Sequence, residues 1–325
     1  TKGDISLTVS PELKHIRPII LGAVVRGVCL AGEEEIDSFI KSLMDHQEKL
    51  HFALGRGRKR ASIGVHDLNN IKPPFHVKAV PGDTEFIPLA MSEPMTINQI
   101  LEKHPKGIDY AHLLEGFELF PVIVDSNDAI LSFPPIINGS HTTVTNQTRD
   151  FFIDVTGWDL RSCESSLMLI ASQLSERGGT IESVEVTDHN GNVSNYPNGN
   201  AVLHKLPCDL LDGLLGRKLT DDEISVAINR MGGKFKSRDV SEITLEMPRW
   251  RFDILHPVDL VEEIAIGHGY EDLGSDVPKA PMTAIARSDG NLRRRIRDSM
   301  QGLGLMQIQS LTLSNDDDQF NFVRF

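Results

Sequence analysis

The chain has 325 residues, of which 40% are hydrophobic and 24% charged, and its formal net charge at pH 7 is -13. This composition is typical of a globular protein with room for two or three domains. It contains no apolar run near the roughly 18 residues that a membrane span needs, and the opening residues TKGDISLTV lack the layout of a secretion signal. The negative charge argues against general DNA binding, which needs clustered Lys and Arg. We expect a cytoplasmic protein with no membrane partner.

Residues 1–200 are predicted to form an α+β domain with a mixed sheet. Residues 4–30 have the pattern of strands, and 34–55 carry apolar residues at helical spacing up to a final glycine. Strands are predicted at 61–65 and 76–80, and a short helix at 97–103. Asp159 is a suitable N-cap for a helix that ends near 177–179. The alternating stretch 181–186 and the turn HNGN then predict a hairpin.

Residues 201–276 are predicted to form a small α+β module after the polar stretch SNYPNGN. A helix is expected at 208–215, and Thr220 and Glu223 form a capping box for a second helix. Strands near 234–237 and 242–247 precede a third helix that begins at Pro257. Residues 277–325 are predicted to form a truncated third part, with a basic helix at 291–301 and a strand at 306–313.

Four acidic residues in the stretch RFDILHPVDLVEEIAIGHGYEDL suggest two alternatives. Asp259, Glu262 and Glu263 stand at helical positions i, i+3 and i+4, and Asp253 arrives from the preceding extended segment. Carboxylates grouped in this way suit Mg²⁺ or Ca²⁺. The other reading is that acids in a first helical turn complement the helix dipole, with Asp253 paired to Arg249 or Arg251. Both remain open from spacing alone.

Several strings in this sequence resemble the β subunit of phenylalanyl-tRNA synthetase, in its archaeal and eukaryotic form. PRWRFDILHPVDLVEEIAIGHGYEDL resembles the signature of the B5 module. GRGRKRASIGVHDLNNIKPPF, YAHLLEGFELFPVIVDSNDAILSFPPIIN and TRDFFIDVTG resemble the B3/B4 editing domain, and MQGLGLMQIQSLTLSN resembles the start of the catalytic-like module. The resemblance implies a B3/B4-like domain at 1–200, a winged-helix-like B5 module at 201–276 and the beginning of a class II synthetase-like module at 277–325.

The resemblance also implies partners and a cofactor. The family charges phenylalanine tRNA with phenylalanine at the expense of ATP, in a tetramer of two α and two β subunits, with the synthetic site on the α subunit. Its Mg²⁺ site has two aspartates and two glutamates in the spacing of Asp253, Asp259, Glu262 and Glu263, which we therefore expect to bind Mg²⁺. Such an ion would be structural, with part of its coordination from water or the α subunit.

An editing site is the chemistry that the resemblance implies for this chain itself. The family's B3/B4 domain hydrolyses tyrosine attached in error to phenylalanine tRNA, because an apolar pocket cannot strongly reject an added hydroxyl. Asp154 lies on the apolar strand FFIDV, where a carboxylate is costly without a task, and we expect it to bind the tyrosine hydroxyl or amino group. Thr156 lies on the same face. Ser132, Asn138 and Ser140 are expected on a loop, holding the water or the terminal ribose.

Two rival readings remain open. The chain could be a non-catalytic fragment for assembly or RNA docking, or a freestanding Mg²⁺-dependent hydrolase that uses the acids at 253–263. A paired metal site usually needs more ligands than that stretch offers. His66 and His256 are expected to be structural, although His66 could line the editing pocket and His256 could cap the acidic helix.

Overall fold

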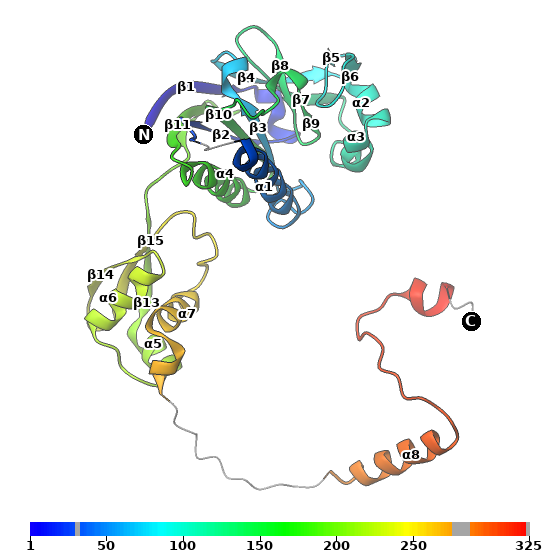
Figure 1. The fold of residues 1–325 in the computed structure, drawn as a ribbon, viewed down its shortest axis with the longest axis vertical. Helices are drawn as coiled ribbons and strands as arrows, with labels where there is room; N and C mark the ends of the chain where they lie inside the picture. Colours follow the sequence, from blue (N-terminus) through cyan, green and yellow to red (C-terminus); the bar gives the residue numbers. More distant parts are fainter. Residues whose placement is uncertain (30–32, 275–286, 323–325) are drawn as a thin grey trace. The chain divides into compact units, whose positions relative to one another are not determined.

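The computed structural model describes residues 1–29, 33–274 and 287–322, in two units, Thr1–Leu273 and Gly274–Phe325. Figure 1 shows a large mixed sheet with helices in the first unit, followed by a smaller module. The predicted α+β class with a mixed sheet is confirmed.

The large sheet has the strand order β3-β10-β2-β11-β1-β4-β7-β8-β9, with β12 also paired to β11. Strand β1 is parallel to β11 and β4, and the other pairs are antiparallel. This arrangement brings β10, which carries Asp154, between β2 and the edge strand β3. The strand bounds are β1 Lys2–Val9, β2 Ile19–Arg26, β3 Ala61–Asp67, β4 Phe75–Pro81, β7 Leu119–Val124, β8 Ile130–Phe133, β9 Ile137–Asn138, β10 Phe151–Gly157, β11 Thr180–Thr187 and β12 Val193–Tyr196.

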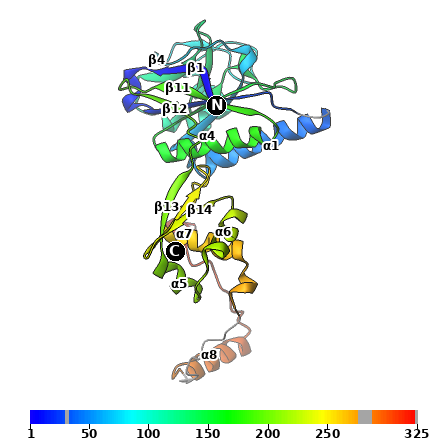
Figure 2. The ribbon, with the colours of Figure 1, turned by 90° about the vertical axis from the view of Figure 1, so that its left-hand side faces the viewer.

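Helices α1 (Glu33–Phe52) and α4 (Leu160–Ser175) lie side by side on one face of this sheet (Figure 1 and Figure 2). Apolar side chains of β2, β3 and β10 pack against them in one buried cluster. Asp159 caps α4 by accepting a hydrogen bond from the N–H of Ser162, as predicted. On the other face a second cluster includes residues of α2 (Ile97–Lys103), which precedes α3 (Pro105–Tyr110) and follows the short hairpin β5 (Glu85–Phe86) and β6 (Met95–Thr96).

Side chains of α1 supply hydrogen bonds along the free edge of β3. Gln47 Nε2 donates to the carbonyl oxygen of Ile63 at 2.7 Å, and the N–H of Ile63 donates to His51 Nε2 at 2.8 Å. An edge strand otherwise leaves these groups without partners. These two hydrogen bonds hold the last turns of α1 next to β3, the strand that pairs with β10 and its Asp154.

The small module packs three helices against the antiparallel sheet β13-β15-β14. The Thr220 and Glu223 side chains form the predicted capping box of α6. The helix α7 begins at Pro257 and is followed by Gly269, whose φ of +106° suits glycine. The bounds are β13 Val202–Pro207, α5 Cys208–Leu215, α6 Asp221–Arg230, β14 Lys234–Arg238, β15 Glu242–Met247 and α7 Pro257–His268.

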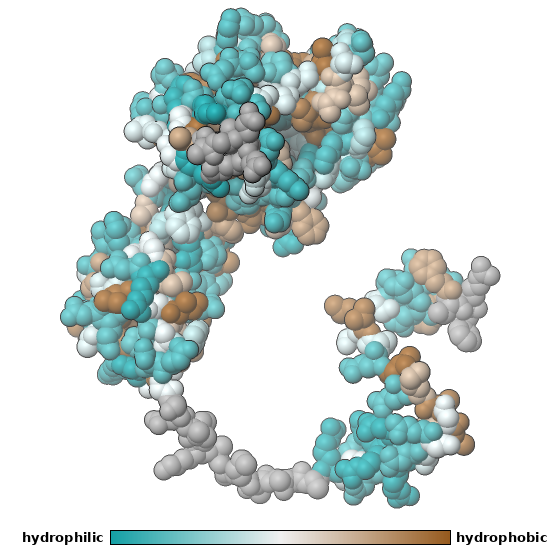
Figure 3. All heavy atoms as spheres, in the orientation of Figure 1, coloured by the Kyte–Doolittle hydropathy of each residue, from teal (hydrophilic) through white to brown (hydrophobic). Residues whose placement is uncertain are grey.

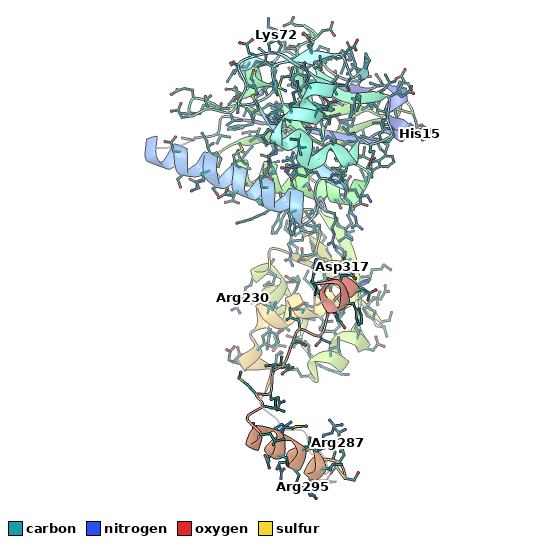
Figure 4. All side chains as sticks on the ribbon, turned by 90° about the vertical axis from the view of Figure 1, so that its right-hand side faces the viewer. His15, Lys72, Arg230, Arg287, Arg295 and Asp317 are labelled. Atoms are coloured by element: carbon teal, nitrogen blue, oxygen red, sulfur yellow. The ribbon has the colours of Figure 1, made fainter. Side chains whose placement is uncertain are left out.

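The second unit contains the predicted basic helix, α8 (Gly290–Gly302), from which Arg295 projects in Figure 4. A single π-helical turn follows at Asp317–Asn321. The strand predicted at 306–313 is wrong, because these residues have no strand pairing. Their apolar side chains are exposed (Figure 3), and an apolar alternation forms a strand only beside a partner strand. Within the described ranges, no helix is long and apolar enough to cross a bilayer.

Candidate functional site

A cavity of about 300 Å³ lies beside the edge strand β3. Its volume is at the lower end of the range for small-molecule pockets, about 300–1,000 Å³, and therefore suits one amino-acid side chain with its ester. The wall combines apolar groups with polar side chains from α1, β3, β10 and the segment 132–144. The polar lining residues are Gln47, Glu48, His51, Arg58, Ser62, Lys106, Ser132, Asn138, Thr142, Thr143 and Asp154.

Asp154 lines this cavity and is only 1% exposed. Its Oδ2 lies 2.7 Å from His66 Nε2, and His66 Nδ1 lies 2.8 Å from Thr142 Oγ1. A carboxylate in such surroundings needs a hydrogen-bonded partner, and His66 provides it. The hydrogen bond between Asp154 and His66 fixes the direction in which the carboxylate points.

Glycine at position 64 makes room for this pair. Gly64 faces Asp154 across the β3–β10 ladder. A Cβ added there would lie 2.0 Å from Asp154 Oδ2 and 2.8 Å from His66 Nε2. Only a residue without a side chain therefore leaves the carboxylate and the imidazole in contact.

The structure brings two of the other predicted residues to the cavity. Ser132 lies on β8 and Asn138 on β9, so both belong to strands and not to the expected loop. Ser132 Oγ donates to Asn138 Oδ1 at 3.2 Å, and Asn138 Nδ2 lies 3.4 Å from the carbonyl oxygen of Val65. Ser140 begins a 3-10 turn and is not among the lining residues.

Thr156 lies behind the lining, in contact with Ser62. Arg17 is fully buried and donates from Nε to Thr156 Oγ1 at 2.7 Å and from Nη2 to Ser62 Oγ at 3.0 Å. The hydroxyls of Ser62 and Thr156 are 2.9 Å apart. Burial lowers the pKa of Arg17 to about 10, so the guanidinium is still charged at neutral pH. Arg17 thereby fixes both hydroxyl oxygens as acceptors.

A charged cluster lies at another part of the wall. Glu48 Oε1 lies 2.9 Å from Arg58 Nη2, 3.6 Å from Lys106 Nζ and 3.7 Å from His51 Nδ1. His51 first, and then the cations Arg58 and Lys106, lower the pKa of Glu48 to about 2. The Glu48 side chain is 50% exposed, whereas those of His51 and Arg58 are buried. The Glu48 carboxylate is thus paired with two cations at this part of the wall.

Sequence reasoning missed most of these polar residues. The strand ASIGVHD places Ser62, Gly64 and His66 at every second position of an otherwise apolar run, which is the period of one strand face. That alternation was the available signal for a polar face opposite Asp154. No local pattern pointed to Arg17, because its partners lie 41 to 139 residues away in the chain.

The four acids of the predicted Mg²⁺ site have different surroundings. Arg251 binds Asp253 at 2.7 Å and Glu263 at 2.6 Å. Asp259 accepts hydrogen bonds from the main-chain N–H groups of residues 255 and 256, both at 2.7 Å. Glu262 is exposed, whereas Glu263 is buried. The pKa of Asp253 is lowered by its bonds to Arg251, and that of Asp259 by the main-chain donors.

This arrangement does not fit a Mg²⁺ ion held by all four carboxylates. The Arg251 guanidinium lies between two of them, and in the described part of the chain no three His, Cys, Asp or Glu side chains converge as metal ligands. The helix-start reading, with Asp253 paired to Arg251, accounts for the geometry. The Mg²⁺ site stays a prediction from the family resemblance.

Two protein families match this chain. Residues 32–187 match the B3/4 domain, and residues 204–270 match the tRNA synthetase B5 domain. The first match contains β3, β10 and the whole lining of the cavity. The second contains the small module with α7.

Relatives with these domains include two archaeal proteins named phenylalanine–tRNA ligase beta subunit. That of Methanococcoides burtonii is 42% identical over 99% of this chain and 59% of its own length, and that of Methanosarcina acetivorans is 43% identical over 98% and 57%. The chain thus spans somewhat more than half the length of these relatives.

A solved structure shows the same fold. An N-terminal fragment of the phenylalanyl-tRNA synthetase beta subunit from Pyrococcus horikoshii is 34% identical and has a TM-score of 0.77, covering 83% of this chain and 76% of that one. Domains, relatives and fold agree, and the chain therefore belongs to the family of phenylalanyl-tRNA synthetase β subunits.

Proposed function

We propose that this chain is the editing portion of a phenylalanine–tRNA ligase β subunit and hydrolyses tyrosine attached in error to phenylalanine tRNA. The observation that carries the proposal is Asp154, a buried carboxylate that lines a cavity of amino-acid size and is oriented by His66. The names of the relatives support the ligase assignment. An α-subunit partner in an α₂β₂ tetramer, ATP-dependent charging on that subunit and a cytoplasmic location belong to the same proposal.

In the proposed reaction Asp154 accepts a hydrogen bond from the tyrosine hydroxyl, and the apolar wall holds the ring. A site built to bind a hydroxyl discriminates strongly against a substrate that lacks it, because its polar group is then left unpaired. Correctly attached phenylalanine would thus bind poorly. In this proposal Ser132 and Asn138 hold the water. The water oxygen adds to the ester carbonyl carbon, the bond to the ribose oxygen breaks, and the proton lost by the water goes to that ribose oxygen.

The experiment is deacylation of tyrosine-charged phenylalanine tRNA by this chain, wild type against Asp154→Ala. Circular dichroism checks that both are folded. Asp128→Ala is the control, because Asp128 is an exposed acid that pairs with Lys78 and is not among the residues that line the cavity. We expect the Asp154 variant to hydrolyse at least tenfold more slowly, about 1.4 kcal/mol in barrier height. Equal rates would contradict the role of Asp154.

A role in assembly or RNA docking without catalysis is the second candidate. It is favoured by α8, where four arginines are exposed at positions 293, 294, 295 and 297. Such a cluster can neutralise phosphates even in an acidic chain. Absence of hydrolysis by the wild type, together with salt-dependent tRNA binding, would favour this candidate.

A further inference from the structure

The cavity has a buried end and an exposed mouth. Asp154, Ser132 and Thr142 line the buried end and are at most 3% exposed. Lys106 and Glu48 also line the cavity, but their side chains are 42% and 50% exposed, so they mark the place where it opens to solvent. The proposed substrate carries its tyrosyl group into the buried end. The nucleotide to which the ester is attached therefore lies at the mouth.

Lys106 is the cation at the mouth that has hydrogen-bonding capacity left. Glu48 Oε1 accepts a hydrogen bond from Arg58 Nη2 at 2.9 Å, whereas Lys106 Nζ lies 3.6 Å from the same oxygen, beyond hydrogen-bonding distance. Among the described residues, Glu48 is the carboxylate with which Lys106 pairs. The lysine ammonium has three N–H donors. Two cations thus share one carboxylate, and Lys106 can bind a second anion without displacing Glu48.

The position of Lys106 is set by the packing of α3. Its Nζ lies 5.9 Å from the centre of the Tyr110 ring, one helical turn further along the same helix. The helix α3 also approaches α2 closely, because Gly107 has no side chain: a Cβ added there would lie 1.8 Å from the carbonyl oxygen of Ile100. A cation held on a packed helix beside an aromatic ring loses less conformational freedom when an anion binds.

We propose that Lys106 binds the phosphate group that joins the last two nucleotides of the tRNA, and so positions the tyrosyl ester in the cavity. The ester is attached to the ribose of the last nucleotide, and the phosphate on that ribose is the nearest anion of the substrate. A lysine ammonium is a suitable partner, because it binds phosphate as a point charge without a fixed plane of approach. The inference rests on the proposed editing function and adds to it a contact with the carrier of the amino acid.

The test compares two stable analogues of the substrate in which an amide replaces the ester. One is 3′-tyrosylamido-adenosine, and the other has in addition a methyl phosphate diester at the 5′ oxygen, with a single negative charge. Calorimetry measures the affinity of each analogue for this chain. We expect the phosphate to strengthen binding about tenfold in the wild type and less than about twofold in Lys106→Met, as for the loss of one charge-assisted contact.

Two further variants control this comparison. Lys103→Met is the matched control, because Lys103 is an exposed lysine in the last turn of α2 and does not line the cavity. It should keep the full gain from the phosphate, and Lys106→Arg, which retains a cation, should keep most of it. The phosphate-free analogue should bind all four proteins with affinities equal to within about twofold, because its contacts are independent of Lys106.

Kinetics with tyrosine-charged phenylalanine tRNA give an independent readout. Lys106→Met should raise KM and leave kcat unchanged, because a phosphate remote from the ester is bound equally in the ground state and the transition state. The difference in KM between this variant and the wild type should shrink as NaCl screens the charges. A lower kcat with an unchanged KM would overturn the inference.

The binding experiment separates failure of this inference from failure of the editing function. An equal gain from the phosphate in the wild type and Lys106→Met, or no gain in the wild type, would overturn the inference and leave the editing proposal standing, since the phosphate-free analogue reports on the tyrosyl pocket alone. An equal loss of affinity for both analogues in Lys106→Met would assign Lys106 to support of the wall through Tyr110, and would also overturn it. If neither analogue binds the wild type, the editing proposal fails and the inference fails with it.

Discussion

The cavity around Asp154 and the acidic stretch around Arg251 both contain carboxylates, but only the carboxylate of Asp154 lines a cavity that could hold a ligand. At Asp154 one oxygen is bound by His66, and the carboxylate still lines open space. In the acidic stretch, Arg251 binds Asp253 and Glu263, and main-chain N–H groups bind Asp259. The number of acids is therefore a poor guide to a binding site. What matters is whether hydrogen-bonding capacity remains for a ligand.

Arg251→Met should give the largest effect on stability. The Arg251 and Glu263 side chains are 12% and 10% exposed, and removing one partner of a buried ion pair costs about 3–5 kcal/mol. Because Asp253 is half exposed, we expect about 3 kcal/mol. Denaturant unfolding read by Trp250 fluorescence, in a Trp158→Phe background, would measure it in the small module.

The control for that variant is Glu262→Gln, which changes an exposed neighbour and should leave stability within about 0.5 kcal/mol. An equal loss in both variants would show that the pairing of Arg251 contributes little. The two regions would then differ less than their geometry indicates.

Gly64→Ala should give the second-largest loss of stability, and it should also change the cavity. The added Cβ would lie 2.0 Å from Asp154 Oδ2, so the carboxylate must move away from His66, and overpacking of this kind costs about 1–3 kcal/mol. We expect deacylation at least tenfold slower. Gly213→Ala is the matched control, because nothing lies within 4 Å of a Cβ at that position; similar losses in both would contradict the packing argument.

Acid titration should give a smaller effect. The folded-state pKa of Glu48 is about 2, below the usual value near 4.3. The carboxylate therefore stabilises the fold above the unfolded-state pKa, and this contribution is lost as the pH falls through 2. Wild type should lose more Tm than Glu48→Gln between pH 5 and 2, by an amount that salt reduces because Glu48 is half exposed. Parallel curves for the two proteins would contradict this.

Addition of Mg²⁺ should give the smallest change in thermal stability when this chain is measured without a partner subunit. Arg251 already neutralises two of the four carboxylates, so millimolar MgCl₂ should shift Tm by less than about 1 °C. An ion at 100 times its Kd would stabilise the fold by about 2.7 kcal/mol. A shift of several degrees that disappears in Asp259→Asn would contradict the expectation and support the Mg²⁺ site that the family resemblance implies.

Local patterns predicted most of the fold. The caps at Asp159 and Thr220, the start of α7 at Pro257 and the hairpin of β11 and β12 depend on residues within a few positions of one another, and all are observed. The strand at 306–313 failed because a strand also needs a distant partner. The resemblance pointed to Asp154, Ser132 and Asn138 at the cavity, whereas Ser140 lies outside its lining.

The sequence by itself determined the composition class, most helices and strands, and the family, because these depend on short-range spacing and on motifs that can be read in order. Only the tertiary structure decided the partners of each polar group. It joined Asp154 to His66 across 88 residues, Arg17 to Thr156 across 139, and Arg251 to two acids. The physical reason is that a side chain's protonation and its free hydrogen-bonding capacity depend on the atoms around it in space, which chain order does not specify.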